Sequence, residues 1–444
     1  MQCGRRAPEA SCIMPLATDE SSIPPAVSRM THDAAAYDTL HGQADRPLPG
    51  TSLTLSGSTN EPTDAGAVSP DGGGERAAGS RVLHVTEATG AGVLSYITMV
   101  ANRQAANGSR VGVLMLGDRP DRASGWREAF DPAIQVTECR SDAGLLGRLG
   151  AYLHAIRRGV LQFRPDALHL HSSIAGALAR IAVPTAAMRS VASIVYQPHG
   201  VSYMREDVSA PTRFAYFAAE WLLSLTRVPL IGVSVGEQSV LRRLPGAVVH
   251  LIENGVQAEE IPVRVPRPEP SRLRIGTVNR ICAQKDPQFF AEVARLLPAD
   301  RFELIWIGDG DADLRAVLAS SGVDVRGWLP RAQALAELAT FDLYLQPSRW
   351  EGMPLSLIEA QVAGVPAVAR DVIGNREILA RTGGGRLATS ASQAAAELLA
   401  LAEAPALRQA LGARARTNAI EAYSMDRIAG QLDALYRSAA RPVR

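Results

Sequence analysis

From residue 81 onward, short apolar runs alternate with helix-like segments. The stretch "RVLHVTEATGAGVLSYITMVANRQAANGSRVGVLML" has apolar runs at 82–85 and 111–116, with a glycine-containing turn and a helical pattern at 93–102 between them. This order predicts a strand, a helix and a second, parallel strand. Four more apolar runs continue the alternation, at 167–171, 193–200, 229–234 and 248–255. Strands that alternate with helices predict a parallel sheet covered on both faces.

A proline-rich segment without periodicity, residues 257–272, interrupts this alternation. The alternation then resumes with apolar runs at 273–278, 302–308, 342–348 and 366–370. We therefore predict two α/β lobes, at 81–256 and 273–430, joined by the linker 257–272 and followed by a C-terminal helix or tail at 431–444. Ligands of open α/β sheets bind at the carboxyl ends of the strands, so the loops facing the cleft between the lobes are where a site is expected.

The first 80 residues differ in composition from the rest. They are rich in Ala, Ser, Thr, Pro and Gly, and Tyr37 is their only aromatic residue. Such a segment buries too little apolar surface to offset its ordering entropy, so residues 1–80 are predicted to be disordered.

Charge and cysteine usage exclude several classes of protein. A net charge of +1 and a pI near 7.8 give no global field for nucleic acid, so no polynucleotide partner is expected. The four cysteines show no paired spacing, which argues against a disulfide framework or a zinc site and fits a reducing cytosol. No stretch approaches the roughly 18 apolar residues that span a bilayer. We expect a cytoplasmic protein, soluble or peripheral to the membrane.

The chain has 45 arginines but a single lysine, Lys285, in "NRICAQKDPQFF". One explanation is codon usage, with one lysine left over by chance. The other is that this position needs a compact ammonium, which a planar guanidinium replaces poorly. Sequence pattern alone leaves both explanations open.

A second candidate feature is "RWEGMPLSLIEAQVAGVP", which follows the apolar run at 342–348. Pro354 suits a first helical position, so a helix is expected to begin there and to present free N–H groups beside Glu351. Glu359 lies five residues further along, about 7.5 Å at 1.5 Å per residue. The two carboxylates could hold the ends of an elongated polar ligand.

The segment "SRWEGMPLSLIEAQVAGVPAVARDVIGNREIL" resembles the donor-binding region of the retaining GT-B glycosyltransferases of family four. "IENGV", "GTVNRICAQKDPQFFAEVARLL", "WIGDGDADL" and "VRGWLPRAQALAELATFDLYLQPS" flank it in the family's order, and the resemblance covers roughly residues 81–435. It implies a GT-B fold with two Rossmann-like lobes around a cleft. It also implies a UDP- or GDP-linked sugar as donor, with no further cofactor and no metal.

The resemblance also implies roles for individual residues of the second lobe. Glu351 would hold a hydroxyl of the transferred sugar, while Glu359 would accept from the ribose diol. Arg280 and Lys285 would neutralise the diphosphate; Asn279 stands where many relatives have glycine. Backbone groups would meet the sugar and diphosphate at Gly352, Met353, Pro354 and Leu355, and the base near Leu329. The structural alternatives are that Glu359 caps or salt-bridges its own helix and that the two cations form a solvated surface pair.

In the first lobe, Gly90 and Gly92 follow the first predicted strand and would let N–H groups approach a phosphate or the acceptor. The alternative is that this turn only packs a helix onto the sheet. His199, in "YQPHG", ends a predicted strand, a position that favours a functional role. The resemblance implies that it faces the cleft close to the sugar. His169 and His171 alternate along another strand, and we expect packing and hydrogen bonding from them.

An Asp-x-Asp triplet in "GDGDAD", residues 308–313, could suggest a divalent metal site. It follows a predicted strand of the second lobe, and we interpret it as the turn before a helix. The resembled family generally uses a helix N-terminus and cations in place of a metal, so we expect no metal requirement.

Residues 140–230 contain ten arginines and five acidic residues. They include "RFAYFAAEWLLSLTR" at 213–227, which is largely apolar with a charge at each end. This segment is either a buried helix with solvated arginines around it or part of a basic, apolar-edged surface that meets anionic lipid. The two stretches "YQPHGVSYMREDVS" and "RFAYFAAEWLLSLT", residues 196–209 and 213–226, also resemble bacterial enzymes that extend lipid-diphosphate-linked glycans for exopolysaccharide. This resemblance implies a lipid-linked glycan acceptor at the cytoplasmic face of the inner membrane.

The predicted function is that of a retaining hexosyltransferase acting in exopolysaccharide or cell-envelope polysaccharide synthesis. The first alternative is another GT-B enzyme, such as a nucleotide-sugar 2-epimerase or a phosphorylase. The second is a non-catalytic nucleotide-sugar-binding module.

Overall fold

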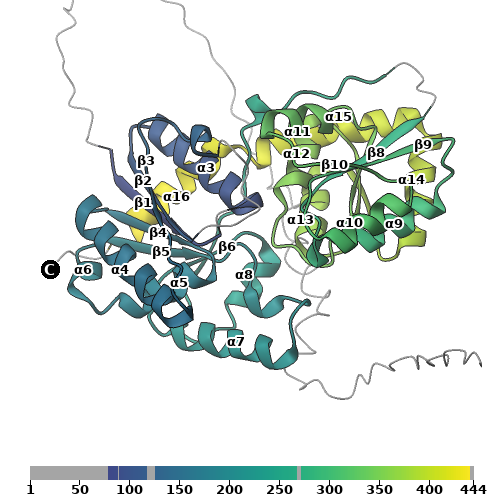
Figure 1. Ribbon diagram of the computed structural model, residues 1–444. Helices are drawn as coiled ribbons and strands as arrows, with labels where there is room; N and C mark the ends of the chain where they lie inside the picture. The colour runs from purple at the N-terminus through teal and green to yellow at the C-terminus, as the bar shows by residue number, and fades with distance from the viewer. Residues whose placement is uncertain (1–78, 89, 118–125, 268–271, 441–444) are drawn as a thin grey trace, which may run out of the picture. The chain divides into compact units, whose positions relative to one another are not determined.

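A seven-stranded parallel sheet forms the first lobe of the protein (Figure 1). The computed structural model describes residues 79–88, 90–117, 126–267 and 272–440, which all belong to one compact unit. Along the first sheet the strands run β3-β2-β1-β4-β5-β6-β7. Their bounds are β1 Arg81–Thr86, β2 Arg110–Leu116, β3 Gln135–Cys139, β4 Ala167–His171, β5 Ser193–Gln197, β6 Leu230–Gly232 and β7 Val249–Leu251. The predicted disorder of residues 1–80 concerns residues outside the described part, apart from 79 and 80.

Helices connect these strands, as expected for parallel pairing. They are α3 Ala91–Ala106, α4 Leu145–Phe163, α5 Ser173–Ala182, α6 Ala186–Arg189, α7 Ala210–Ser224 and α8 Val235–Leu241. Apolar side chains of α4 and α5 pack on one face of the sheet, and those of α3 pack on the other. The central strands β4 and β5 are buried along their whole length, as expected for a parallel sheet covered on both faces, and their polar residues, such as His169 and His171, are buried with the apolar ones.

The second lobe has a six-stranded parallel sheet in the order β10-β9-β8-β11-β12-β13. Its strands are β8 Leu273–Val278, β9 Phe302–Ile307, β10 Asp324–Gly327, β11 Leu343–Gln346, β12 Ala367–Arg370 and β13 Gly385–Ala388. Its helices are α9 Pro287–Leu296, α10 Ala312–Ser320, α11 Arg331–Leu338, α12 Leu355–Ala363, α13 Ile373–Thr382, α14 Ala391–Glu403 and α15 Pro405–Ala422. Two Rossmann-like parallel-sheet lobes confirm the predicted fold class.

The last described helix, α16 Met425–Ser438, returns to the first lobe and lies beside α3 (Figure 1). Its buried face, including Ile428, Leu432 and Leu435, joins the apolar cluster of the first sheet. The predicted boundary between residues 430 and 431 therefore falls inside one helix. The buried positions recur at helical spacing from 425 to 436, so the chain has no break at that boundary.

The predicted linker is ordered by contacts with the second lobe over much of its described length. It contains a 3-10 turn at Ala258–Glu260. Arg264 and Arg267 then form ion pairs with Asp342, at 2.7 and 2.5 Å, and the Arg264 amide donates to the carbonyl of Ala363. Within the described residues, no helix is both long and apolar enough to cross a membrane.

Candidate functional site

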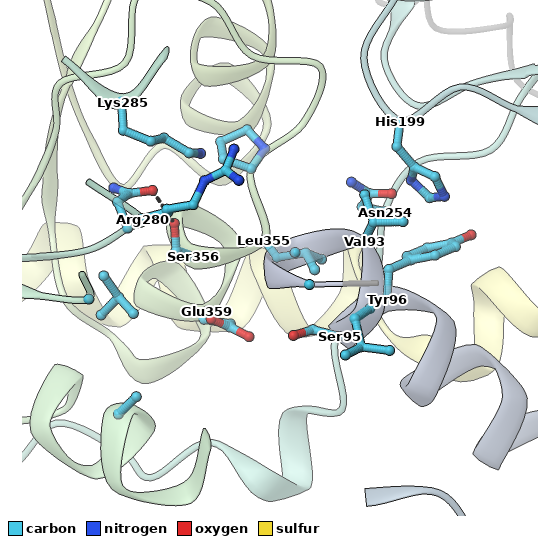
Figure 2. Close-up of a pocket in the computed structure, with 18 of the residues that line it drawn as sticks. Val93, Ser95, Tyr96, His199, Asn254, Arg280, Lys285, Leu355, Ser356 and Glu359 are labelled. Atoms are coloured by element: carbon cyan, nitrogen blue, oxygen red, sulfur yellow. Dashed lines mark hydrogen bonds between the residues drawn. The ribbon is translucent and has the colours of Figure 1, made fainter. Parts of the chain in front are cut away.

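A cavity of about 400 Å³ is lined by residues of both lobes. This volume lies within the range of small-molecule sites. Figure 2 shows Arg280 and Lys285 on one side of the cavity, with His199 and Tyr96 on the other. The structure brings all twelve candidate residues to this cavity: Gly90, Gly92, His199, Arg280, Lys285, Leu329, Glu351, Gly352, Met353, Pro354, Leu355 and Glu359.

The two cations lie in the loop that leaves β8, where a short 3-10 turn spans Ala283–Lys285. The Lys285 ammonium pairs with the Glu351 carboxylate, and its side chain is only 18% exposed. Lys285 is therefore not a solvated surface cation. The next residue, Asp286, caps α9 by accepting from the Phe289 amide, which fixes where the loop ends.

A neighbouring glycine loop supports this cationic loop, a feature that sequence reasoning treated only as a turn. Gly308 and Gly310 have φ of 128° and 158°, and a Cβ on either would lie about 2 Å from a backbone oxygen of residue 279 or 281. Only glycine permits that approach. A hydrogen bond from the Asp311 amide to the Ile281 carbonyl, 3.0 Å, joins the two loops.

The Asp-x-Asp triplet in "GDGDAD" lies at the N-terminus of α10 and caps it. Asp311 is the N-cap of α10 and accepts hydrogen bonds from the amides of Asp313 and Leu314, each at 3.0 Å. Asp309 pairs with Arg315 at 2.5 Å. The prediction of a turn before a helix is confirmed.

Glu351 and Glu359 are both engaged by side chains of other elements. Besides Lys285, Glu351 accepts from the Gln346 amide at 3.1 Å, at the end of β11. Glu359 is buried and pairs with Arg331 of α11 at 2.7 Å. The structural alternative that Glu359 salt-bridges its own helix is therefore wrong, because its partner belongs to another helix.

Arg331 is a cavity residue that sequence reasoning missed. Besides Glu359, it contacts Met99 Sδ of the first lobe at 3.5 Å and Glu260 of the linker at 3.7 Å. Its only sequence signal is its position after Pro330, at the start of a helix.

Helix α12 begins one residue later than predicted. Pro354 is its N-cap, with φ −73° and ψ 121°, and Leu355 is the first helical residue. Pro354 carries no N–H, so it contributes no donor to an anion at this helix end. The donors come from its neighbours, and no side chain caps the helix N-terminus. Asn254 of the first lobe holds the Met353 carbonyl by donating to it at 2.7 Å.

The two first-lobe glycines lie at the start of α3. Gly90 is its N-cap, with extended φ of −148° and no side-chain capping bond. A Cβ built on Gly92 meets no atom within 4 Å. Close packing of a helix on the sheet therefore does not explain the glycine at position 92, and open space there is compatible with an approaching ligand.

His199 follows β5 and lines the cavity, with a left-handed φ of 55°. Its Nε2 lies 2.9 Å from His171 Nδ1, and its ring packs edge-on against Tyr96. Burial lowers the pKa of His199 to about 3, so its ring is neutral at physiological pH. The expected hydrogen bonding of His169 and His171 is confirmed: His171 bonds both His84 and His199, and His169 bonds Tyr436.

Helix α7 is inverted relative to an ordinary surface helix. Phe214, Trp221, Leu222 and Leu225 at its C-cap are 66%, 45%, 63% and 52% exposed. Its acidic residue, Glu220, is buried and accepts two hydrogen bonds from Arg180, at 2.9 and 3.0 Å. Tyr216 and Phe217 of the same helix are partly buried and pack against the apolar core of the first lobe, so the alternative of a buried helix holds for only part of its apolar surface. An exposed apolar stripe of this kind marks an interaction surface.

Comparison with known protein families gives two matches. The model described as Glycosyltransferase Family 4 matches residues 90–260, and the one described as Glycosyl transferases group 1 matches residues 272–404. Together they cover both sheets except for the first strand.

Individual relatives share about a quarter of their residues with the chain over the aligned part. The chain is 26% identical over 233 residues to UDP-Gal:alpha-D-GlcNAc-diphosphoundecaprenol alpha-1,3-galactosyltransferase of Escherichia coli, covering 47% of this chain and 59% of that protein. It is 25% identical over 276 residues to the amylovoran biosynthesis glycosyltransferase AmsK of Erwinia amylovora, covering 57% and 66%. The chain thus spans about three fifths of the Escherichia coli relative's length.

Solved structures resemble the chain over most of its length. Sucrose-phosphate synthase from Thermosynechococcus elongatus aligns with a TM-score of 0.69 at 16% identity, covering 81% of this chain and 98% of that one. HepE of Anabaena, in complex with UDP and glucose, aligns with a TM-score of 0.66 at 16% identity, covering 81% and 100%. At these identities the likeness shows the fold.

Proposed function

Because the chain belongs to glycosyltransferase family four and has the GT-B fold, we propose that it transfers a hexose from a nucleoside diphosphate sugar to a glycan hydroxyl in bacterial polysaccharide synthesis. UDP and GDP are the proposed carriers. A relative from Escherichia coli is named as a UDP-Gal-dependent transferase. A neighbouring structure contains UDP and glucose.

One observation carries the proposal: two cations, a helix N-terminus and two carboxylates line the same cavity. Cleavage of the sugar–diphosphate bond increases negative charge on the diphosphate. Fixed cations and N–H groups there stabilise the transition state more than the ground state, which lowers the barrier. Carboxylates accept hydrogen bonds from the hydroxyls of a sugar and a ribose.

The proposed reaction retains the anomeric configuration. The acceptor attacks from the face that the diphosphate leaves, and the leaving diphosphate takes the acceptor proton. Arg280, Lys285 and the start of α12 hold the diphosphate throughout. These groups neutralise the negative charge of the diphosphate, which a bound metal ion does in other glycosyltransferases. Metal independence is therefore part of the proposal.

The function is tested by incubating the protein with UDP-, GDP- and ADP-sugars, selecting the donor by thermal shift and resolving the products by chromatography. A glycoside formed only with an acceptor, and formed equally in EDTA, supports the proposal. An epimer released without acceptor would establish the epimerase alternative. Activity that EDTA abolishes and Mn²⁺ restores would overturn metal independence.

The proposed acceptor is a lipid-linked glycan, presented at the cytoplasmic face of the membrane. The Escherichia coli relative is named for a diphosphoundecaprenol acceptor, which is lipid-linked. The exposed apolar stripe of α7 belongs to the lobe with the local excess of arginine. Apolar side chains would enter the headgroup region while arginines attract anionic lipid.

We expect the double variant Phe214→Ser, Trp221→Ser to bind anionic vesicles at least about tenfold more weakly, because each exposed aromatic loses apolar area worth ~1 kcal/mol or more. Turnover of a water-soluble acceptor analogue should not change. Vesicle sedimentation measures the binding. Leu296→Ser, a similarly exposed change in the second lobe, is the control. Equal binding of the wild type to neutral and anionic vesicles contradicts the lipid contact.

We expect Lys285→Arg to lower kcat by ~10-fold or more, since removing a transition-state donor typically costs 10²-fold and arginine compensates in part. The planar guanidinium group of arginine does not replace the compact ammonium group of lysine at a position where the side chain is only 18% exposed and already paired with Glu351. Steady-state kinetics with the identified donor checks this. Near-normal turnover would make codon usage the better explanation of the lone lysine.

A further inference from the structure

A continuous line of hydrogen bonds runs through the core of the first lobe and ends at the cavity. Gln104 Oε1 lies 2.8 Å from His84 Nε2, and His84 Nδ1 lies 2.9 Å from His171 Nε2. His171 Nδ1 in turn lies 2.9 Å from His199 Nε2. Gln104, His84 and His171 are fully buried, whereas His199 is partly exposed and lines the cavity.

The rings in this line are neutral. Burial lowers the pKa of His84 to about 4, that of His199 to about 3 and that of His171 well below its usual value. The other titratable groups packed on the line are His169, Tyr96 and Tyr436, which are uncharged at neutral pH. A neutral imidazole has one N–H donor and one acceptor nitrogen, so each bond in the line fixes the direction of the next.

Gln104 sets that direction. Its amide nitrogen lies 3.4 Å from the Tyr436 hydroxyl, which leaves its carbonyl oxygen facing His84. An amide oxygen only accepts, so His84 Nε2 donates to it and His84 Nδ1 must accept from His171 Nε2. His171 Nδ1 then accepts from His199 Nε2.

We propose that the buried line Gln104–His84–His171 fixes His199 as its Nε2–H tautomer, so that His199 Nδ1 meets a ligand only as a hydrogen-bond acceptor. Among the described residues Nδ1 has no hydrogen-bond partner. Its partner in the complex is a hydroxyl group of the donor or acceptor sugar, since a hydroxyl can donate to it and a diphosphate oxygen cannot. Gln104, His84 and His171 are thus positioning residues. The ligand class rests on the proposed function, whereas the tautomer does not.

A metal site is the rival explanation of the same cluster. One ring nitrogen from each of His84, His169 and His171 lies within 4.8 Å of the others. Both ring nitrogens of His84 and of His171 already have histidine or glutamine partners at 2.8 or 2.9 Å, so a metal would have to break the line. The hydrogen bonds account for these two residues without a metal.

The tautomer is tested directly on the full chain labelled with ¹⁵N-histidine. Eight histidines give a tractable spectrum, and His199→Gln identifies the signals of His199. We expect His199 with Nε2 protonated and Nδ1 unprotonated, unchanged from mildly acidic to mildly basic pH. An Nδ1–H tautomer, or one equivalent of bound zinc in the purified protein, overturns the proposal whatever the enzyme's activity.

The effect of Gln104 on the tautomer of His199 is tested by Gln104→Leu. This change removes the amide at the end of the line that does not reach the cavity. We expect mixed tautomers of His199 and a kcat lowered on the order of 10-fold, similar to the lower end of the effect of hydrogen-bond partners that orient metal-ligating histidines. Affinity for the nucleoside diphosphate should be unchanged. Gln238→Leu, a buried glutamine of α8 in the same lobe, should leave the tautomer and kcat unaltered. A His199 signal and kcat unchanged in Gln104→Leu overturn the proposal, and the wild-type spectrum decides it if that variant does not fold.

Discussion

Arg280→Ala is expected to lower kcat by about 100-fold or more, because removal of one preorganised donor at a developing anion typically costs 10² to 10³ in rate. The side chain extends into the cavity beside Lys285 (Figure 2). Its charge acts on the leaving diphosphate, so the loss should appear in kcat more than in donor binding. Single-turnover kinetics with the identified donor separates the chemical step from product release.

The control for this change is Arg295→Ala, an exposed arginine of α9 that does not line the cavity. It removes the same charge from the same lobe and should leave kcat within experimental error. If Arg280→Ala retained normal kcat and only weakened donor binding, Arg280 would stabilise the diphosphate equally in the ground state and in the transition state. The argument that Arg280 lowers the barrier would then be wrong.

Glu351→Gln is expected to lower kcat by about 100-fold, again the cost of removing one group that acts on charge in the transition state. The amide keeps the size of the side chain but loses the negative charge that pairs with Lys285 and one of the two oxygens that can accept from a sugar hydroxyl. Lys285 then has a neutral hydrogen-bond acceptor in place of a carboxylate, while the contacts of Gln284 with Arg349 and Trp350 still hold the loop against the segment after β11. Donor hydrolysis in the absence of acceptor measures this effect without knowledge of the acceptor.

Glu359→Gln provides the comparison, because its carboxylate is proposed to hold the ribose and not the transferred sugar. The loss should fall on the donor KM and on the affinity for the free nucleoside diphosphate, with a smaller change in kcat. The reverse pattern, with kcat lost at Glu359 and donor affinity lost at Glu351, would exchange the two assigned roles.

The strands at the edges of the two sheets could not be predicted from the pattern of apolar residues. β3, β10 and β13 were not predicted, and each lies at an end of its sheet. Their side chains are mostly half-buried or exposed, unlike those of the central strands. A strand at the edge of a sheet is covered incompletely. It therefore shows neither a continuous apolar run nor a strict alternation of apolar and polar residues, which are the two patterns that predict a strand.

The sequence by itself determined the two parallel sheets, the order of their central strands along the chain and twelve of the residues at the cavity. The physical reason is local: buried parallel strands need apolar runs, and their carboxyl-end loops meet at one edge of the sheet. Arg280, Lys285, Glu351 and Glu359 could therefore be found from loop position and resemblance to a family.

Only the tertiary structure decided which side chains face one another. The Lys285–Glu351 and Arg331–Glu359 pairs join residues 66 and 28 positions apart. The line from Gln104 to His199 and the return of α16 to the first lobe likewise depend on packing between distant segments. The apolar pattern of α7 did not show which face is buried, because Arg180 and Tyr196 of neighbouring elements fix Glu220 inside. Burial is set by the partners that a side chain finds in the fold, and these partners have no fixed spacing in the sequence.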